Sequence, residues 1–124
     1  MNVNNVVLSG ILVDLPQFKT IGKSELSYFV IEYSRNMKKK DGTVYVDKIN
    51  VDCEAWGFLA NKMKGCKKSQ NIIVNGKIKV NEWKTEKDNF IKKRYVISVD
   101  SVDFDTINTD TNNMDSTRSD AFEE

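Results

Sequence analysis

Two stretches in the middle of the chain alternate apolar and polar residues with the two-residue period of a β-strand. In segment 49–56 the apolar set, predicted to face inward, consists of Ile49, Val51, Cys53 and Ala55. The opposite face carries Asn50, Asp52, Glu54 and Trp56. Trp56 is therefore predicted to point away from the core, at the end of its strand.

The second alternating stretch, 72–83, has the same design. Its predicted inward face consists of Ile72, Val74, Gly76, Ile78 and Val80. Its other face carries Asn75, Lys77, Lys79, Asn81 and Trp83. Lysines beside exposed indoles supply the charge and the stacking surface that a single nucleic-acid strand requires. The alternative is that both tryptophans fold back into a hydrophobic rim.

Three further β-rich segments, 5–15, 26–35 and 94–104, complete the pattern. Pro16 is expected to end the first segment, in which Gly10 permits a bend or bulge. A basic hairpin loop is predicted over 36–43, with Asp41-Gly42 at its turn. Residues 57–66 have the apolar spacing of a short helix packed by one face. The polar connection 84–93 contains Phe90, which is unusual in a solvated loop.

The order of these elements predicts an all-β fold with little helix. Three strands, one short helix and two more strands are the order of the five-stranded Greek-key barrel called the OB-fold, which commonly binds oligonucleotides. Some other small barrels, including SH3-like ones, share this order. The fold alone does not give the function.

Length and charge suggest one folded domain followed by a tail. The 124 residues carry a net charge of +1, which divides unevenly: 18 Lys/Arg against 13 Asp/Glu in 1–105, and one Arg against five acids in 106–124. We predict a binding domain over 1–105. The polar, acidic segment 106–124 has too little apolar surface to fold and is predicted to be a disordered tail.

Several classes of site and location are not indicated by the sequence. The chain has no histidine, and Cys53 and Cys66 lie too far apart for a CxxC metal motif, so we expect reduced thiols, no metal and no cofactor. No apolar run approaches the length of a membrane span, and the N-terminus lacks the features of a signal peptide. We expect a soluble cytoplasmic protein.

Five sequence blocks together resemble the bacterial and phage single-stranded DNA-binding proteins over residues 4–104. They are NNVVLSGILVDLP, YFVIEYSR, INVDCEAWGFLANK, IIVNGKIKVNEW and KRYVISVDSVDF. The block DCEAWGFLA and the spacing from Gly76 to Trp83 are the most specific. The resemblance implies an OB-fold that binds single-stranded DNA with little sequence preference during replication, recombination and repair, without catalysis.

The resemblance assigns roles to individual positions. Trp83 and Trp56 stand where the family has base-stacking aromatics, Arg35 stands at a commonly basic position, and the loop lysines lie where DNA wraps. With the lysines that flank Trp83, the predicted DNA-binding set is Trp56, Trp83, Arg35, Lys38, Lys39, Lys40, Lys77, Lys79 and Lys84. The chain has amides at Asn50 and near Asn36, where relatives often carry aromatics, which implies fewer stacking platforms.

The resemblance also bears on partners. Bacterial relatives end in acids and a hydrophobic tip whose last residue is Phe, whereas this chain ends in SDAFEE. Asp120, Phe122 and Glu123 are the predicted contacts for replication or repair proteins, with a purely solubilising tail as the alternative. Most relatives are homotetramers that pair through the first strand, so a homo-oligomer is expected, a tetramer or else a dimer.

Two other function classes stay open at this point. OB-like barrels can host nucleases, although metal-assisted hydrolysis lacks its usual ligands and base in this sequence. A barrel that recruits a replication partner, with nucleic acid secondary, is the second alternative.

Overall fold

The computed structural model describes residues 1–87 and 89–105 of the chain. Five of its strands form a closed barrel: β1 (Val6–Leu12), β3 (Ser24–Lys38), β4 (Val44–Trp56), β5 (Asn71–Lys84) and β6 (Ile91–Phe104). Their order is β1-β5-β6-β4-β3, and β1 also pairs with β3 to close the barrel. Only the β4–β6 pair is parallel among the described residues. The predicted five-stranded OB-fold barrel is confirmed.

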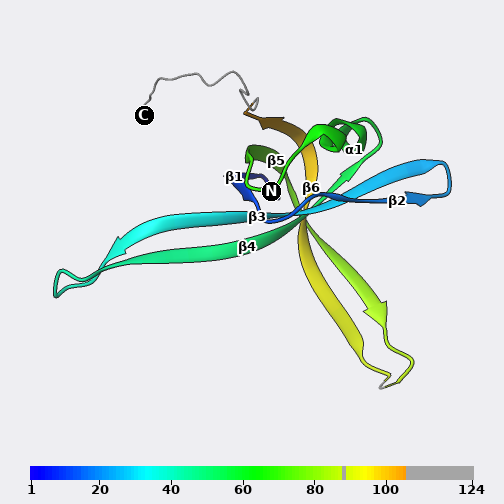
Figure 1. Cartoon of the computed structure of the whole chain (residues 1–124). Coiled ribbons are helices and arrows are strands. Elements are labelled where there is room, and N and C mark those ends of the chain that lie inside the picture. The colour runs from blue at the N-terminus through cyan, green and yellow to red at the C-terminus, as the bar shows by residue number, and fades with distance from the viewer. Residues whose placement is uncertain (88, 106–124) are drawn as a thin grey trace.

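Three hairpins extend from the barrel in different directions (Figure 1). The β3–β4 hairpin pairs continuously from Leu26 with Trp56 to Lys38 with Val44, so its strands are longer than predicted. The loop is therefore limited to residues 39–43. Gly42 takes the left-handed conformation there, with φ of 94°, and the Asp41 carboxylate accepts a hydrogen bond from the Thr43 amide at 2.9 Å. The predicted turn at Asp41-Gly42 is confirmed.

Strand β2 (Gln17–Ile21) was not predicted. It forms a hairpin with β3, in which Gln17 pairs with Tyr28 and Ile21 with Ser24. Every residue of β2 is exposed, so the strand has no buried face to produce an alternating pattern. The first strand ends at Leu12 rather than before Pro16, because the chain leaves the barrel there to enter this hairpin.

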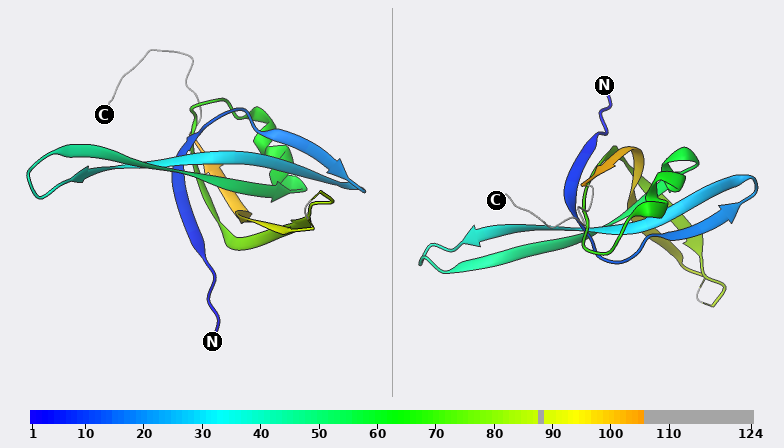
Figure 2. Two further views of the ribbon diagram at one scale, coloured as in Figure 1. Left: turned by 90° about the horizontal axis from the view of Figure 1, so that it is seen from below. Right: turned by 45° about the horizontal axis from the view of Figure 1, so that its top comes forward.

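The predicted helix at 57–66 is present as α1 (Phe58–Lys62) followed by a single 3-10 turn, η1 (Met63–Gly65). Gly57, with φ of 60°, turns the chain from β4 directly into α1. The helix packs against β3, β4 and β6 beside the barrel (Figure 2). Ala60 and Met63 are fully buried, whereas Phe58 on the opposite face is 78% exposed.

The core lies inside the barrel, and both cysteines belong to it as free, buried thiols. Burial and the neighbouring Asp52 charge raise the pKa of Cys53 to about 12, and burial also raises that of Cys66. Strand β1 crosses the barrel so closely that a side chain on Gly10 would collide with the Glu32 carbonyl oxygen. Gly76 makes the same kind of approach to Ser98, where the β5–β6 register shifts and leaves Asp100 of β6 as an extra residue.

Part of the predicted inward face is wrong. Ile49, Ile78 and Val80 are exposed, although each is in phase with buried residues of its own strand. The reason is that β4 and β5 continue past the barrel into hairpin arms, where no other described element covers the same face (Figure 1). Alternation identifies a face, but it does not locate the point at which the core ends.

Asp120, Phe122 and Glu123 lie outside the described residues, as does the rest of the segment 106–124. In the described part of the chain, no helix is long and apolar enough to cross a membrane.

Candidate nucleic-acid interface

Strand pairing places side chains of β2 to β6 around one concavity, which we call the groove. Its volume is about 1000 Å³. Residues opposite each other in a ladder share a face of the sheet. Tyr28 pairs with Glu54, and Asn81 pairs with Arg94, so all four lie on the groove face. The alternating residues that line it are Gln17, Lys19, Ile21, Leu26, Tyr28, Val30, Asp52, Glu54, Trp56, Lys79, Asn81, Trp83, Arg94 and Val96.

Both predicted tryptophans line this groove. Trp56 is the last residue of β4 and is 38% exposed, and Trp83 lies near the end of β5 and is 45% exposed. They come from strands that are not adjacent in the sheet, since β6 lies between β4 and β5. The interpretation that both fold back into a hydrophobic rim is wrong, because each indole has an accessible surface on the same concavity.

The floor of the groove contains a buried acid, which contradicts the prediction that Glu54 is solvent-facing. Glu54 is only 2% exposed. One of its carboxylate oxygens accepts a hydrogen bond from the Lys79 ammonium at 3.2 Å, and the other accepts one from the Asn81 amide at 2.6 Å. A buried carboxylate requires such partners, and here the partners are groove residues of β5.

The groove therefore compensates most of its positive charge internally. Arg94 lies 3.6 Å from Asp52, measured between Nε and Oδ2, and Lys79 is bound to Glu54. Among the described residues, Lys19 is the groove cation that forms no salt bridge. Strand β5 thus does not present its lysines as a free cationic strip. Lys77, which lies outside the groove lining, is also paired, with Asp100 at 2.8 Å.

The remaining predicted DNA-binding residues lie on the arms. Arg35 forms a salt bridge with Asp47 at 3.3 Å on the β3–β4 hairpin. Lys38 ends β3, and the ammonium of Lys39 lies 5.7 Å from the centre of the Tyr45 ring, in range of a cation–π contact. Lys40 is exposed in the loop. The structure therefore brings Trp56, Trp83 and Lys79 together, and it places the other predicted residues elsewhere.

Three groove residues were missed by the sequence analysis. Tyr28, on β3 next to the Trp56-bearing strand, is half-buried and alternates with the buried Phe29, a signal that was present in segment 26–35. Arg94 lies two residues before the buried Val96 on the same face. Lys19 could not be found without strand β2, which has no recognisable pattern.

On the residues described, no group of three or more potential ligands is arranged to hold a metal ion.

A family model described as the single-strand binding protein family matches residues 3–105. The fold is similar to the Plasmodium falciparum SSB in a complex with ssDNA, with a TM-score of 0.73 and 15% identity, covering 86% of this chain and 97% of that one. It is also similar to a deletion mutant of the single-stranded DNA binding protein from Thermus aquaticus, with a TM-score of 0.72 and 18% identity, covering 84% of this chain and 51% of that one. No curated protein matches the sequence.

Proposed function

The chain belongs to the single-strand binding protein family, and we propose that it binds and protects single-stranded DNA by stacking bases on Trp56 and Trp83 within the groove. The observation that carries this proposal is the presence of both partly exposed indoles on one concave surface. Stacking on an aromatic ring stabilises each base by roughly 1–3 kcal/mol and hardly distinguishes one base from another. Tyr28, on β3, provides a third ring in the same concavity.

Phosphate contacts supply the second part of the proposed mechanism. We assign them to Arg35 and to the lysines of the arms rather than mainly to the groove floor, where Lys79 is held by Glu54. Cations that meet phosphates release condensed counterions, so affinity falls as salt rises. The proposed contacts outside the groove are Arg35, Lys38, Lys39, Lys40, Lys77 and Lys84.

Titration of intrinsic tryptophan fluorescence with oligo-dT tests the stacking role. Oligo-dT should quench the fluorescence, whereas an equal concentration of duplex should not. Trp83→Ala should weaken binding, and Phe58→Ala is the matched control, since Phe58 is an exposed aromatic on α1 outside the groove. Equal affinity for Trp83→Ala and the native protein would contradict the stacking role.

We propose that the protein acts stoichiometrically, without cutting the strand, in the cytoplasm during replication, recombination and repair. Incubation of end-labelled single strand with the protein and Mg²⁺ tests the first point, because any shortening of the strand would contradict it. The division into a binding domain over 1–105 and a tail over 106–124 is part of the same proposal, and the family match over 3–105 supports it.

Oligomerisation and partner docking extend the proposal. The outward face of β1 and β5 carries Val7 and Ile73, which are exposed diagonal neighbours in the ladder and suit burial against a second copy. We propose a homo-oligomer, a tetramer in preference to a dimer, which light scattering would measure. We also propose that Asp120, Phe122 and Glu123 contact replication or repair proteins.

A further inference from the structure

The tip of the β5–β6 hairpin carries an aromatic residue that the groove does not include. Phe90 is 66% exposed and immediately precedes β6. Its carbonyl oxygen accepts a hydrogen bond from the Thr85 amide at 3.1 Å, so Phe90 lies opposite Thr85 and extends the ladder in which Lys84 pairs with Ile91. The exposed phenyl ring leaves apolar surface in water, which a base stacked on it would cover.

The register determines the face on which Phe90 lies. Successive residues of a strand alternate between faces, so Phe90 shares its face with Lys92, Arg94 and Val96. Arg94 and Val96 line the groove. Lys92 pairs directly with Trp83, which also lines the groove. The groove face therefore continues outward along the arm, from Trp83 past Lys92 to Phe90.

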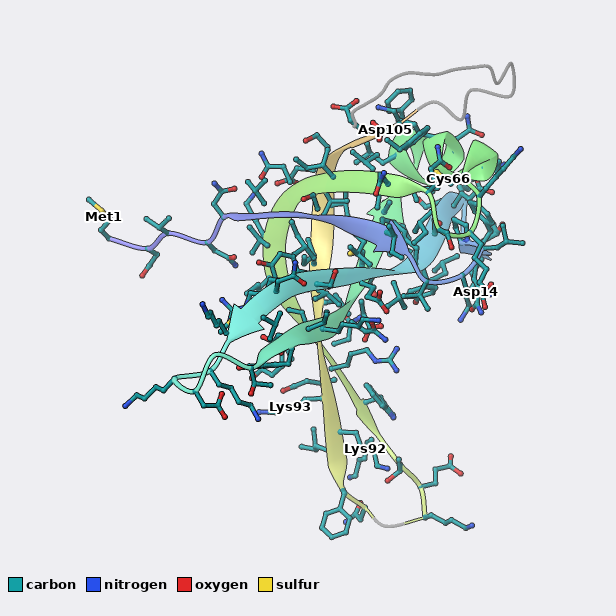
Figure 3. The ribbon with its side chains drawn as sticks, turned by 60° about the vertical axis from the view of Figure 1, so that its left-hand side comes forward. Met1, Asp14, Cys66, Lys92, Lys93 and Asp105 are labelled. Carbon is teal, nitrogen blue, oxygen red and sulfur yellow. The ribbon has the colours of Figure 1, made fainter. Side chains whose placement is uncertain are left out.

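The spacing suits consecutive contacts with one strand of nucleic acid. Phe90 is the diagonal neighbour of Trp83 in the ladder, and such neighbours lie about 7–8 Å apart, within reach of large side chains. Lys92 is the neighbour of both rings on the same face, opposite Trp83 and two residues from Phe90, and forms no salt bridge with any described residue. Figure 3 shows Lys92 and Lys93 on this arm. Lys93, on the opposite face, is paired with Glu82 at 3.7 Å.

We propose that Phe90 is a further base-stacking platform, which receives the nucleotide that leaves the groove beyond Trp83, with Lys92 contacting the adjoining phosphate. The alternation of ring, ammonium and ring matches the alternation of base and phosphate in a single strand. This inference rests on the proposed stacking function of the groove. It adds an exit path along the β5–β6 arm and a longer binding site than the groove alone provides.

The test measures affinity for oligo-dT of increasing length, from about 4 to about 16 nucleotides, the range of site sizes for one OB-fold. Phe90→Ala should weaken binding of the longer oligonucleotides by about fivefold or more, the lower end of the effect of one stacking ring. The shortest oligonucleotides, which occupy the groove alone, should bind Phe90→Ala as tightly as the native protein. Phe58→Ala should be unaffected at every length.

Further substitutions at Phe90 and Lys92 identify the interaction. Phe90→Trp should restore tight binding and add a fluorophore that long oligonucleotides quench, whereas Phe90→Leu, which is apolar but has no ring face, should behave like Phe90→Ala. Lys92→Gln should flatten the slope of log affinity against log salt by about 0.7 for long oligonucleotides only. Lys68→Gln, beside the helix, is the control for that loss of charge.

The outcomes separate this inference from the groove function. If Trp83→Ala weakens binding at all lengths and Phe90→Ala weakens it at none, the exit path is wrong and the groove function stands. An equal loss at every length for Phe90→Ala, or native affinity for Phe90→Leu, would also overturn the proposal. If Trp83→Ala has no effect, the groove function itself fails.

Discussion

The groove and the hairpin arms hold their positive charges differently. In the groove, Lys79 is bound to the buried Glu54 and Arg94 lies beside Asp52. On the arms, a larger set of lysines forms no salt bridge with any residue in 1–87 or 89–105, and it includes Lys38, Lys39, Lys40, Lys84 and Lys92. A phosphate that meets Lys79 or Arg94 must compete with a carboxylate, whereas a phosphate that meets one of these arm lysines displaces no carboxylate of the described residues.

This difference implies that the groove and the arms contribute to DNA binding in different ways. The groove is suited to stacking, which depends little on salt, and the arms are suited to counterion release, which depends on it strongly. The acids in the groove also repel phosphate, so the strand is expected to place its bases toward the indoles and its backbone toward the rim. Variants of the two regions should therefore differ in kind as well as in size.

The largest effect is expected from the groove. Trp83→Ala should weaken binding to oligo-dT by about tenfold or more, from the stabilisation of one stacked base. The slope of log affinity against log salt should remain that of the native protein, because no charge is lost. Fluorescence anisotropy of a labelled oligonucleotide at several salt concentrations measures both quantities. A flattened slope would contradict the assignment of stacking to the groove and of phosphate contacts to the arms.

The loop of the β3–β4 arm should show the opposite behaviour. Replacing Lys38, Lys39 and Lys40 by Gln should flatten the salt slope by up to about two units, at about 0.7 for each phosphate on a single strand. The same titrations at low and high salt measure this change. An unaltered slope would mean that these lysines remain in solvent and contact no phosphate. A control of equal charge replaces residues beside the helix by Gln, namely Lys64, Lys67 and Lys68.

A smaller effect in the opposite direction is expected from the groove acid. Glu54→Gln keeps a hydrogen-bonding side chain against Lys79 and Asn81 but removes the competing charge. Binding should become tighter by up to about fivefold, the range of a partly exposed ion pair, and the salt slope should steepen by about 0.7. Glu25→Gln, whose acid pairs with Lys64 outside the groove at 3.1 Å, should change neither. Weaker binding by Glu54→Gln would show that the pair serves the DNA rather than competes with it.

The smallest change is expected in the reactivity of the two buried thiols. This reactivity checks that each binding variant keeps its barrel folded. The raised pKa of Cys53, about 12, keeps its thiol protonated at pH 8, and both thiols are buried. Each binding variant should therefore react with a thiol reagent as slowly as the native protein, until denaturant unfolds it. Fast labelling at pH 8 in a variant would assign its lost affinity to a disturbed barrel.

The alternating pattern of the sequence predicted the strands that have one buried face, and it missed strand β2, which has no buried face. Segments 49–56 and 72–83 alternate strongly, and their tryptophans were correctly placed on an exposed face. Strand β2 escaped because all its residues are exposed, and Lys19 was missed with it. The burial of Glu54 could not be foreseen from its own strand, because its partners Lys79 and Asn81 belong to a strand more than twenty residues later.

By itself, the sequence determined the barrel, the faces of its strands and the presence of indoles and lysines outside the core, because period and composition are local properties. The tertiary structure decided which of those groups meet. It brought Trp56 and Trp83 into one groove, bound Lys79 to an acid, and left the lysines of the β3–β4 loop outside. Such pairings depend on strand register and on where the arms leave the barrel, and the contacts that fix both are distant in the chain.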